Sequence, residues 1–551
     1  MMIRKGVITW CLTMGIALNM LGQNTVGLVD IEADRAEGYM LVYPDQQGTL
    51  FLLNSCGELV HSWVDETSVP GNGARLISNG SIMRTYVDED GGNPFFTAGG
   101  TGEKVQIKDW DNTILWDHEI SSLMECIHHD AEVLPNGNVL VIAWELKTMQ
   151  EAWNAGRDTV GFGYSSLWPD KIMELQPVGA DQANVVWEWH AWDHLIQDVD
   201  PARMNYGVIS EHPELVDINH LYTSNVNPDW LHTNSIDHNP ELDQIMLSVP
   251  YFNEIWVIDH STTSAEASGH SGGNSGKGGD LLYRWGNPMA YDRGEVSDQQ
   301  LFFNHGAHWI GPGLSPDDSD HGKIMVFNNR VEPDVSAVDI IVPPIDAQGN
   351  YTLDGNSPFL PVEHEQRFAT AVPTDFSSPG QGSAQKLSTG NVLVCSARQG
   401  WTFQLRPDSS IAWSYKIPMI NGIPVTQGTD VMNGTIMFQA EWVPLDDPRI
   451  EGRDLSVTSF IELDPDPTFC QIVLSVEPRA VADPSMISIL DHVLTLQSNE
   501  PLGAYTVYDI TGRAVISGVG RSNMEVIDLQ GMSMGAYVLH SANKSYKFLL
   551  R

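Results

Sequence analysis

One short pattern recurs along the chain: alternating apolar residues, a tight polar turn with Asn or Gly, and a second apolar stretch. Residues 74–83 and 131–141 show it most clearly, with turns at Asn79-Gly80 and Asn136-Gly137. Asn-Gly supplies the positive φ angles of a tight turn, and the β-branched and large apolar residues around it favour strands. Each copy therefore predicts a β-hairpin. Four further copies lie at residues 235–247, 307–326, 384–394 and 429–437.

A second kind of apolar segment alternates with these hairpins and ends in Trp. It occurs at residues 59–63, 114–116, 185–189, 281–285 and 411–413, and one repeat lacks it. Repeating four-stranded units with one aromatic strand each are typical of a β-propeller, where ring closure leaves only short edges. The six hairpins predict an all-β, six-bladed propeller, with a β-sandwich array or a solenoid as the alternatives. The Ser/Gly-rich insert 260–280 is interpreted as a flexible loop without chemistry of its own.

The two ends of the chain differ from this pattern. Arg4 and Lys5 precede an apolar run over residues 6–21 and a small residue at Gly22, which predicts an export signal over residues 1–22. We expect the propeller over residues 23–478 and a small β-sandwich-like module over residues 483–551. No later apolar run approaches the roughly 20 residues of a membrane span. The chain is therefore expected to be exported without a membrane span, periplasmic in transit and then secreted or attached to the cell surface.

Charge and cysteine content narrow the classes of partner. The chain has 71 acidic and 29 basic side chains and a formal net charge of −42. This charge repels nucleic acids and anionic membranes, so we expect no nucleic-acid partner. Cys11 leaves with the export signal, which places Cys56, Cys126, Cys395 and Cys470 in an oxidising compartment, where two disulfides of undetermined pairing could form.

Polar residues occupy the positions just before the innermost strand of each predicted blade. Such strands begin around the central channel of a propeller, so these residues face a common space. Apolar residues would be expected there if the space were only packed. Clustered histidines predict a metal, proton-transfer or anion site. The residues are Asn72, His128, His129, His232, His305, Gln381 and Gln427, with His308 as a further candidate.

Two arginines favour the anion site among these readings. Arg330 and Arg398 follow the strand starts Ile324 and Val392 at the same offset, which predicts that both reach the same rim as the histidines. The planar guanidinium group matches a pair of sulfate or phosphate oxygens. A metal is disfavoured, because no carboxylate is fixed toward the channel. The acidic runs 88–90 and 317–320 are expected to be solvated loops that could bind Ca²⁺ only loosely.

Three motifs resemble the bacterial arylsulfate sulfotransferase family. They are residues 229–237 (DWLHTNSID), 304–307 (NHGA) and 326–329 (VFNN), and the similarity extends over most of residues 38–445. The resemblance implies a six-bladed propeller of the cell envelope. It also implies transfer of a sulfuryl group from a phenolic sulfate donor to a phenol acceptor, without a nucleotide cofactor.

The resemblance also implies roles for individual residues. In the family a central histidine is the nucleophile and forms a sulfohistidine, while other histidines and an arginine hold the sulfate and protonate the phenoxide. His232 and His305 match two catalytic histidines of the family, and Arg330 is a close but displaced match for its arginine. Where a third histidine is expected the chain has Gln381 and Gln427, so His128 or His129 would have to replace it. The lack of this third histidine favours an alternative to the enzyme. The protein would then be a non-catalytic surface propeller that binds a sulfated or acidic glycan or peptide. A hydrolase or lyase with the same histidines is a third reading.

The C-terminal segment carries a separate resemblance. Residues 507–513, 527–529, 535–539 and 547–551 are similar to the C-terminal type A sorting domain of the type IX secretion route of Bacteroidetes-type bacteria. This implies the secretion machinery as a partner and delivery across the outer membrane. Whether the module is then removed stays open.

Overall fold

The computed structural model divides into two compact units, Asn24–Cys470 and Gln471–Arg551. It describes residues 24–470 and 486–550, and the predicted export signal lies outside these ranges. Residues 90, 161–162, 221–227, 312–317, 347, 432–435, 491–492, 498–502, 510–512, 523, 533–534 and 542–543 are also not described.

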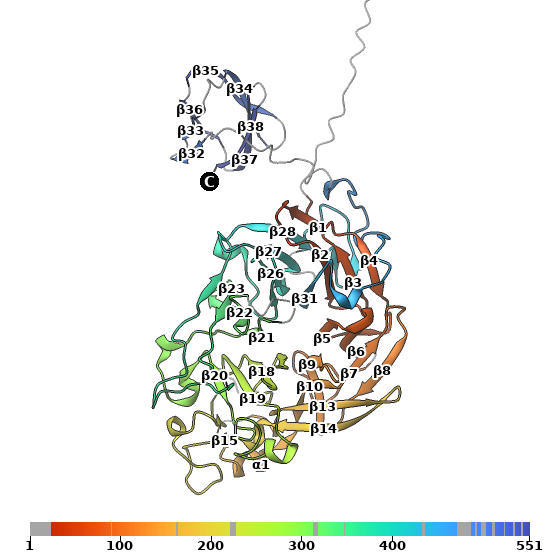
Figure 1. Ribbon diagram of the computed structural model, residues 1–551, viewed down its shortest axis with the longest axis vertical. Helices are drawn as coiled ribbons and strands as arrows, with labels where there is room; N and C mark the ends of the chain where they lie inside the picture. Colours follow the sequence, from red (N-terminus) through yellow and green to blue (C-terminus); the bar gives the residue numbers. More distant parts are fainter. Residues whose placement is uncertain are drawn as a thin grey trace, which may run out of the picture. The chain divides into compact units, whose positions relative to one another are not determined.

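Six antiparallel sheets of four or five strands form the described part of the first unit (Figure 1). The first three sheets are β31 (Met437–Pro444), β2 (Gly38–Pro44), β3 (Leu50–Asn54) and β4 (Leu59–Trp63); β5 (Ser68–Leu76), β6 (Ile82–Asp88), β7 (Lys104–Lys108) and β8 (Ile114–Glu119); and β9 (Glu125–Val133), β10 (Val139–Glu145), β13 (Asp170–Val178) and β14 (Gln182–His190).

The other three sheets follow in chain order. They are β17 (Ser235–Asn239), β18 (Gln244–Val249), β19 (Glu254–Asp259) and β20 (Tyr283–Trp285); β21 (His305–Trp309), β22 (Ile324–Glu332), β23 (Val335–Ile341) and β24 (Gln366–Phe368); and β25 (Ser383–Lys386), β26 (Val392–Ser396), β27 (Trp401–Leu405) and β28 (Ile411–Lys416), with β1 (Gly27–Ile31) added at the outer edge.

Short elements connect these sheets. They are the strand pairs β11 (Lys147–Thr148) with β12 (Ser166–Leu167), β15 (Leu195–Ile196) with β16 (Val216–Asp217) and β29 (Met419–Ile420) with β30 (Ile423–Pro424), the helices α1 (Met149–Asn154) and α2 (Ser264–Ala267), and the 3₁₀ turns η1 (Ser78–Gly80), η2 (Ala191–Asp193), η3 (Ile209–Glu211), η4 (Pro288–Tyr291), η5 (Val296–Asp298), η6 (Pro373–Asp375), η7 (Ala397–Gln399) and η8 (Pro448–Ile450).

The innermost strands close a ring. β5, β9, β17, β21, β25 and β31 each contact the next, and β31 contacts β5. The sheets therefore surround a common centre, and the predicted all-β propeller is confirmed. Ring closure joins the two ends of the unit, because β31 pairs with β2, as Met40 opposite Trp442 shows. The described residues do not form the hairpin predicted over residues 429–437, because residues 429–431 are not in a strand and β31 begins at Met437 and pairs with β2. The predicted turn, at residues 432–435, lies outside the described residues.

The strands that carry the tryptophans lie toward the outer edges of their sheets; they are β4, β8, β14, β20 and β28. Their indole rings connect neighbouring sheets. Each donates an indole N–H to the sheet that follows in the ring. For example, Trp63 donates to the Asp109 carbonyl over 2.9 Å, and Trp413 donates to the Ser55 carbonyl over 2.7 Å. Burying an indole while satisfying its single donor combines a large apolar area with orientation. The other donors are Trp116, Trp187, Trp189 and Trp285.

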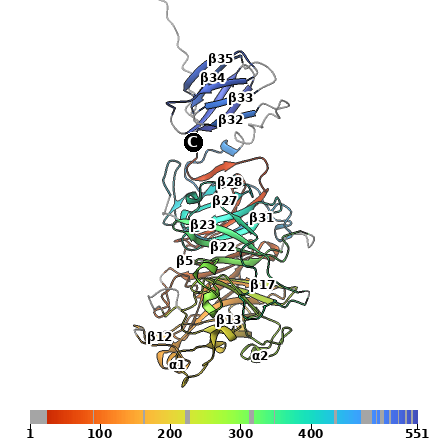
Figure 2. The ribbon, with the colours of Figure 1, turned by 90° about the vertical axis from the view of Figure 1, so that its left-hand side faces the viewer.

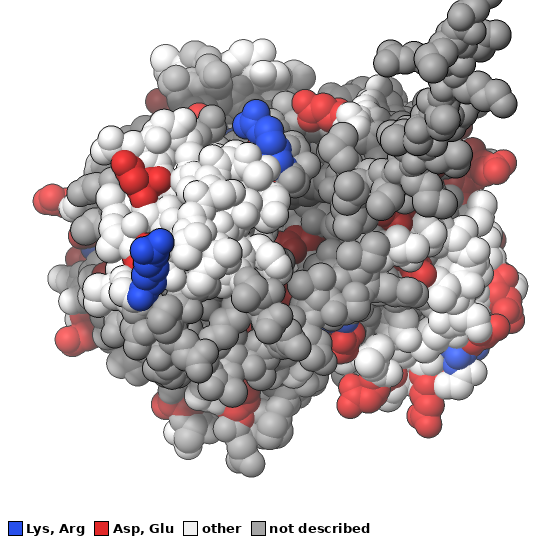
Figure 3. Space-filling view, turned by 90° about the horizontal axis from the view of Figure 1, so that it is seen from above, with Lys and Arg blue, Asp and Glu red and all other residues white. Residues whose placement is uncertain are grey.

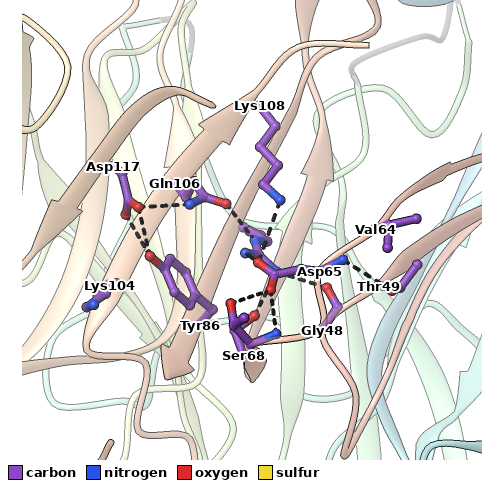
Figure 4. A network of polar contacts seen from close by, with 12 residues as sticks. Gly48, Thr49, Val64, Asp65, Ser68, Tyr86, Lys104, Gln106, Lys108 and Asp117 are labelled. Atoms are coloured by element: carbon purple, nitrogen blue, oxygen red, sulfur yellow. Dashed lines mark hydrogen bonds and ion pairs between the residues drawn. The ribbon is translucent and has the colours of Figure 1, made fainter. Parts of the chain in front are cut away.

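A buried arginine adds a polar connection between the first two sheets (Figure 4). Arg84 of β6 is fully buried and donates to the Tyr43 hydroxyl over 3.0 Å and to the Gly48 carbonyl over 2.9 Å, and it pairs with Asp65. Gln106 accepts from the Arg84 Nε over 3.0 Å. All these partners are needed, because an unpaired buried guanidinium is strongly unfavourable.

One disulfide, Cys56–Cys470, connects positions 414 residues apart. It joins the β3–β4 turn to the last described residue of the unit. Cys126 and Cys395 are free and buried, so among the described residues the expected second disulfide is not formed. No helix in the described ranges is long and apolar enough to cross a membrane.

The C-terminal unit is a small two-sheet β structure (Figure 2). One sheet contains β32 (Met486–Leu490), β33 (Val493–Gln497) and β36 (Met524–Asp528), and the other contains β35 (Ala514–Gly520), β34 (Gly503–Asp509), β37 (Gly535–Ser541) and β38 (Lys544–Leu550). Leu494, Val507, Ile527 and Leu539 form a buried core, as expected for a sandwich-like module.

Candidate active site

Four of the histidines named from the sequence meet on the innermost strands, within β9 and at the starts of β17 and β21. His128 and His129 lie in β9, His232 precedes β17, and His305 opens β21. The ring centroids of His129 and His232 are 4.6 Å apart. Phe438 of β31 lies 5.8 Å from the His129 ring and 6.1 Å from the His305 ring.

Residues at corresponding positions of the innermost strands share a left-handed backbone conformation with positive φ. His129, His232 and Gln381 have φ angles of 56°, 57° and 63°, and Asn72 in the equivalent strand has 94°. Left-handed backbone is uncommon for residues other than Gly, and such residues cluster at functional sites. The pairing of β9 with β10 is irregular at the two histidines, a bulge of the kind that redirects side chains beside active sites.

A hydrogen-bond chain of Asp170, His128 and His129 fixes the tautomers of both imidazoles. Asp170 Oδ1 lies 3.2 Å from His128 Nε2, and His128 Nδ1 lies 2.8 Å from His129 Nδ1. A carboxylate can only accept, so His128 Nε2 carries a proton and donates it. The two facing Nδ1 atoms cannot both donate, and with its proton on Nε2 His128 accepts at Nδ1 from the Nδ1–H of His129. The lone pair of His129 is therefore on Nε2.

The environment of His129 keeps this imidazole neutral. Burial, together with the positive charge of His232, holds the pKa of His129 well below its ordinary value of 6.5. The ring packs directly against Gly100, where a Cβ atom would lie 2.1 Å from His129 Cε1. Gly100 also has a φ of 86° and accepts from the His129 backbone N–H over 2.6 Å. Only glycine fits there without displacing the imidazole.

His232 has the opposite electrostatic setting. Its Nδ1 donates to Asp229 Oδ2 over 2.5 Å, and the ring stacks on Tyr251 with centroids 4.8 Å apart. Burial opposes the charged form, but the charge and hydrogen bond of Asp229 outweigh it, and the pKa of His232 is raised. Asp229 also accepts from the indole of Trp144, which stacks on His128 at 4.0 Å. Asp170 thus bonds to His128 and Asp229 bonds to His232, with one carboxylate behind each imidazole.

His305 uses both ring nitrogens within the protein. Nδ1 lies 2.8 Å from Asn329 Oδ1, and Nε2 accepts from the Gln381 backbone N–H over 3.1 Å. Burial lowers the pKa of His305 to about 3, although the bond to Asn329 opposes the shift. The imidazole is neutral and holds the segment before β25 against β21. The Gln381 Oε1 atom beside it is buried and has no hydrogen-bond partner in the described residues.

Both arginines predicted at the rim lie beside this segment. The guanidinium of Arg330 is 3.9 Å from the centroid of Phe303, and its Nε donates to the Pro379 carbonyl over 2.7 Å. Arg398 is exposed, and one of its terminal nitrogens lies 4.0 Å from the position that a Cβ on Gly380 would occupy. Both arginines are exposed, in a chain with 71 acidic and 29 basic side chains. Acidic side chains are also more frequent than basic ones on the face drawn in Figure 3.

Two candidates from the sequence lie elsewhere. His308 Nδ1 donates to the Gly306 carbonyl over 2.9 Å, and burial, reinforced by the charge of Arg75, lowers its pKa. Gln427 bonds to the backbone of Thr25 and Val26 at the outer edge of the last sheet, so its expected place among the histidines is wrong. Phe438 occupies the inner position instead, because ring closure changes the spacing of the last repeat.

In the described residues of the acidic runs 88–90 and 317–320, the carboxylates are not grouped as ligands for Ca²⁺; those that form ion pairs are paired with lysines. Asp88 pairs with Lys104 over 2.5 Å, and Asp320 pairs with Lys323 and Lys386 over 3.0 and 2.8 Å. Asp90 and Asp317 lie outside the described residues.

Sequence reasoning missed the groups behind the histidines. Asp170 opens β13 and reaches His128 from another part of the sheet, and no local motif marks it. Asp229 is part of the recognised motif, three residues before His232, and this spacing could have indicated the pair. Tyr251 and Phe438 are aromatic residues without a distinguishing pattern.

These features define a β-propeller with a cluster of histidines on its innermost strands. A nucleophilic nitrogen, a protonatable imidazole and nearby guanidinium groups suit the transfer of an anionic group. The family model for arylsulfotransferase (ASST) matches residues 113–442, more than half of the chain, and the chain belongs to this family. The matched range contains all four histidines and Arg330.

Comparison with solved structures yields distant matches. A protein of unknown function from Bacteroides caccae has 11% identity and a TM-score of 0.38, over 74% of this chain and 99% of that one. Virginiamycin B lyase from Staphylococcus aureus has 12% identity and a TM-score of 0.30, and the match covers 69% of this chain and 85% of the lyase chain. The β-propeller domain of Cps50 (Swd1) from Myceliophteria thermophila has 9% identity and a TM-score of 0.34, and the match covers 72% of this chain and 88% of that domain's chain. The search among curated proteins found no match.

Proposed function

We propose that the protein moves a sulfuryl group from a phenolic sulfate ester to a phenol, with His129 as nucleophile and His232 as general acid and base. The family supports an arylsulfotransferase-like activity. The observation that carries the assignment is the Asp170–His128–His129 chain, which leaves a lone pair on His129 Nε2 beside an imidazole of raised pKa. Neighbouring groups whose pKa values are pushed in opposite directions are typical acid and base partners.

The reaction has two balanced steps. In the first, His129 Nε2 attacks the sulfur of the donor, an N–S bond forms, and the bond from sulfur to the phenolic oxygen breaks. Protonated His232 gives its proton to the departing phenoxide. In the second, neutral His232 takes the proton of the acceptor phenol, the phenol oxygen attacks sulfur, and the N–S bond breaks. His129 recovers its lone pair, and the acceptor leaves as a sulfate ester.

The other residues bind and position in this proposal. Arg330 offers its guanidinium to the sulfate oxygens, with Arg398 as a second cation at the rim. Phe303, beneath Arg330, offers a face for the phenol ring. His305 is a positioning residue, because it holds the Gln381 backbone while the partnerless Gln381 Oε1 can accept from a phenol hydroxyl.

The test combines trapping of the intermediate with two variants. The wild-type protein and His129→Gln are mixed with an aryl sulfate without acceptor, quenched in base, digested and analysed for a peptide that gains one SO₃ group. We expect the modification on the peptide containing His129, and in the variant no modification and at least about 10³-fold slower turnover. His118→Gln, at a half-buried histidine of β8 whose Nδ1 lies 2.9 Å from the Asp181 carbonyl, is the matched control and should behave as wild type. Full turnover by His129→Gln, or a modification on another histidine, would overturn the assignment.

The second variant tests the acid. His232→Gln should lose most activity with phenyl sulfate but much less with 4-nitrophenyl sulfate, because 4-nitrophenoxide leaves without a proton. Equal losses with both donors would contradict the acid role. Free phenol without a sulfated acceptor would indicate hydrolysis. Binding of sulfated glycans without turnover by a folded protein would favour the non-catalytic propeller.

We also propose that the chain is exported, with residues 1–22 as its signal and the C-terminal unit as its sorting domain. The Cys56–Cys470 disulfide supports an oxidising destination. The N-terminal sequence of the mature protein, and its location in cells with and without residues 483–551, would test this. An intact N-terminus on a cytoplasmic protein would contradict it.

A further inference from the structure

The insert 260–280 is held in place rather than being a flexible loop, which corrects the interpretation drawn from its Ser/Gly content. Thr263 forms a capping box with Glu266 at the start of α2. The Ser275 backbone N–H donates to Asp259 over 2.8 Å, and Trp189 donates to the Gly279 carbonyl over 2.7 Å. None of residues 268–277 is buried, so apolar packing contributes little to this order.

Three side chains from separate places converge beneath the insert. They are His194, which follows η2, and His270 and Asp280 of the insert itself. His194 Nδ1 and His270 Nδ1 lie 2.8 and 2.7 Å from the same atom, Asp280 Oδ1. The three donor atoms all lie within 4.8 Å of one another. The His194 side chain is fully buried, whereas that of His270 is 63% exposed, so one side of the group faces solvent.

The tautomer of His194 indicates what the group is built for. Its Nε2 lies 2.8 Å from the Ala267 carbonyl oxygen, which can only accept, so Nε2 carries the proton. The other ring nitrogen, Nδ1, faces Asp280 Oδ1, so both ligand atoms point into the same buried place beside His270. Metal-bound histidines characteristically donate their second N–H to a backbone carbonyl, as His194 does.

We propose that His194, His270 and Asp280 bind a divalent transition-metal ion of the Zn²⁺ type, with water as the fourth ligand on the exposed side. Two imidazole nitrogens and one carboxylate oxygen suit Zn²⁺ better than Ca²⁺ or Mg²⁺, which prefer oxygen ligands. In a tetrahedral site with bonds of about 2.1 Å, donor atoms lie about 3.4 Å apart. Both contacts to Asp280 Oδ1, at 2.8 and 2.7 Å, are shorter than this, so metal binding requires a small rotation of the Asp280 carboxylate as well as of the exposed His270 ring. The ion would fasten the insert to the segment after β14.

A second His/carboxylate group in the chain provides the contrast. His260 bridges two carboxylates, with Nδ1 2.8 Å from Asp243 and Nε2 3.2 Å from Glu174, and His238 also contacts Asp243. Burial opposes its charged form, but the two carboxylates raise the pKa of His260 to about 9. Both ring nitrogens of His260 face carboxylates, whereas one ring nitrogen of His194 bonds to a backbone carbonyl, as metal-bound histidines characteristically do.

Metal content and binding test the proposal without reference to activity. The full mature chain is stripped with a chelator and titrated with Zn²⁺ against a chromophoric competitor, and the bound metal is measured by mass spectrometry. We expect the wild-type protein to bind one Zn²⁺ per chain. The affinity for Zn²⁺ should be lower by about 100-fold or more in His270→Ala and in Asp280→Asn. With Ca²⁺ as the probe, we expect no difference between the wild type and these variants. The controls are His212→Ala, an exposed histidine paired with Glu214, and His260→Ala.

Proteolysis provides a second measurement in case a variant is less stable. Lys277 is exposed in the insert, so trypsin should cut there when the loop opens. At a free Zn²⁺ concentration 100 times the Kd, cleavage in the wild type should slow by about 100-fold, and cleavage in His270→Ala should not respond to Zn²⁺. Wild-type protein without stoichiometric Zn²⁺, unchanged affinity in both ligand variants, or a loss of affinity only in His260→Ala would overturn the proposal.

Discussion

Replacing Asp170 with Asn tests whether the nucleophile depends on the tautomers fixed by the hydrogen-bond chain. Asp170 Oδ1 accepts from His128 Nε2 over 3.2 Å, and Oδ2 accepts from the Thr233 backbone N–H over 2.8 Å. In Asp170→Asn, an amide oxygen can keep the bond to Thr233 while the NH₂ group faces His128. His128 Nε2 must then accept, His128 Nδ1 donates to His129, and the proton of His129 moves to Nε2.

The expected loss is large because the attacking lone pair is removed in the ground state. In a Ser-His-Asp triad the same carboxylate-to-amide exchange, which leaves the geometry intact and produces the wrong tautomer, lowers kcat by about 10⁴-fold. We therefore expect kcat to fall by about 10³ to 10⁴-fold, or roughly 4 to 5.5 kcal/mol of activation free energy. KM should change little, because Asp170 lies behind the histidines and does not face the arginines.

The assay is acceptor-dependent release of a fluorescent phenol from its sulfate ester, with folding checked by near-ultraviolet circular dichroism. Asp117→Asn is the matched control. Asp117 accepts from Tyr86 and from Gln106 within its own sheet, so its loss perturbs a polar network without touching the histidines. An Asp170→Asn protein that folds and retains kcat within a few fold of wild type would refute the tautomer argument and the assignment of His129.

Three other predictions concern pH and stability. His232 should act as an acid at pH values below its pKa, which is raised above 6.5, so kcat should fall as the pH rises through that pKa. In Asp229→Asn this fall in kcat should occur at lower pH. The stability that protonated His232 contributes is fully present below pH 6.5 and is lost as the pH rises through its folded-state pKa. Arg84→Ala should lower the free energy of unfolding in urea by about 3 to 5 kcal/mol, whereas removing the exposed Arg513 should change it by less than about 1 kcal/mol. Cys56→Ser should lower it by about 2 to 5 kcal/mol, and a reductant should then have no further effect.

The sequence carries most of the fold because each repeat is locally specified. Asn79 and Gly80 adopt φ angles of 58° and 64°, as their turn requires, and the tryptophan strands take the outer places. The exception is the last repeat. Its innermost strand pairs with β2 across the ring closure, a contact between distant residues that no local pattern encodes.

Composition gave the wrong picture of the insert 260–280. Ser and Gly favour flexible chain only when nothing else fixes the backbone. Here the fixing groups come from outside the segment, such as Asp259 and Trp189, and Gly279 lets the backbone pass closely by His194. A Cβ at Gly279 would lie 1.9 Å from the Ala267 carbonyl oxygen, so this glycine serves close packing rather than flexibility.

The histidines could be located from the sequence, but their roles could not, because the roles depend on how each ring is connected to a carboxylate. Asp229 bonds directly to His232, so its negative charge favours the protonated ring and makes an acid. Asp170 reaches His129 only through His128, so it sets which nitrogen of His129 carries the proton, while burial and neighbouring positive charge keep that ring neutral. In the proposed reaction, the same two residue types thus supply an acid and a nucleophile side by side. Both carboxylates lie behind the imidazoles, which leaves the rim to the guanidinium groups and makes an anionic substrate acceptable to a strongly acidic protein.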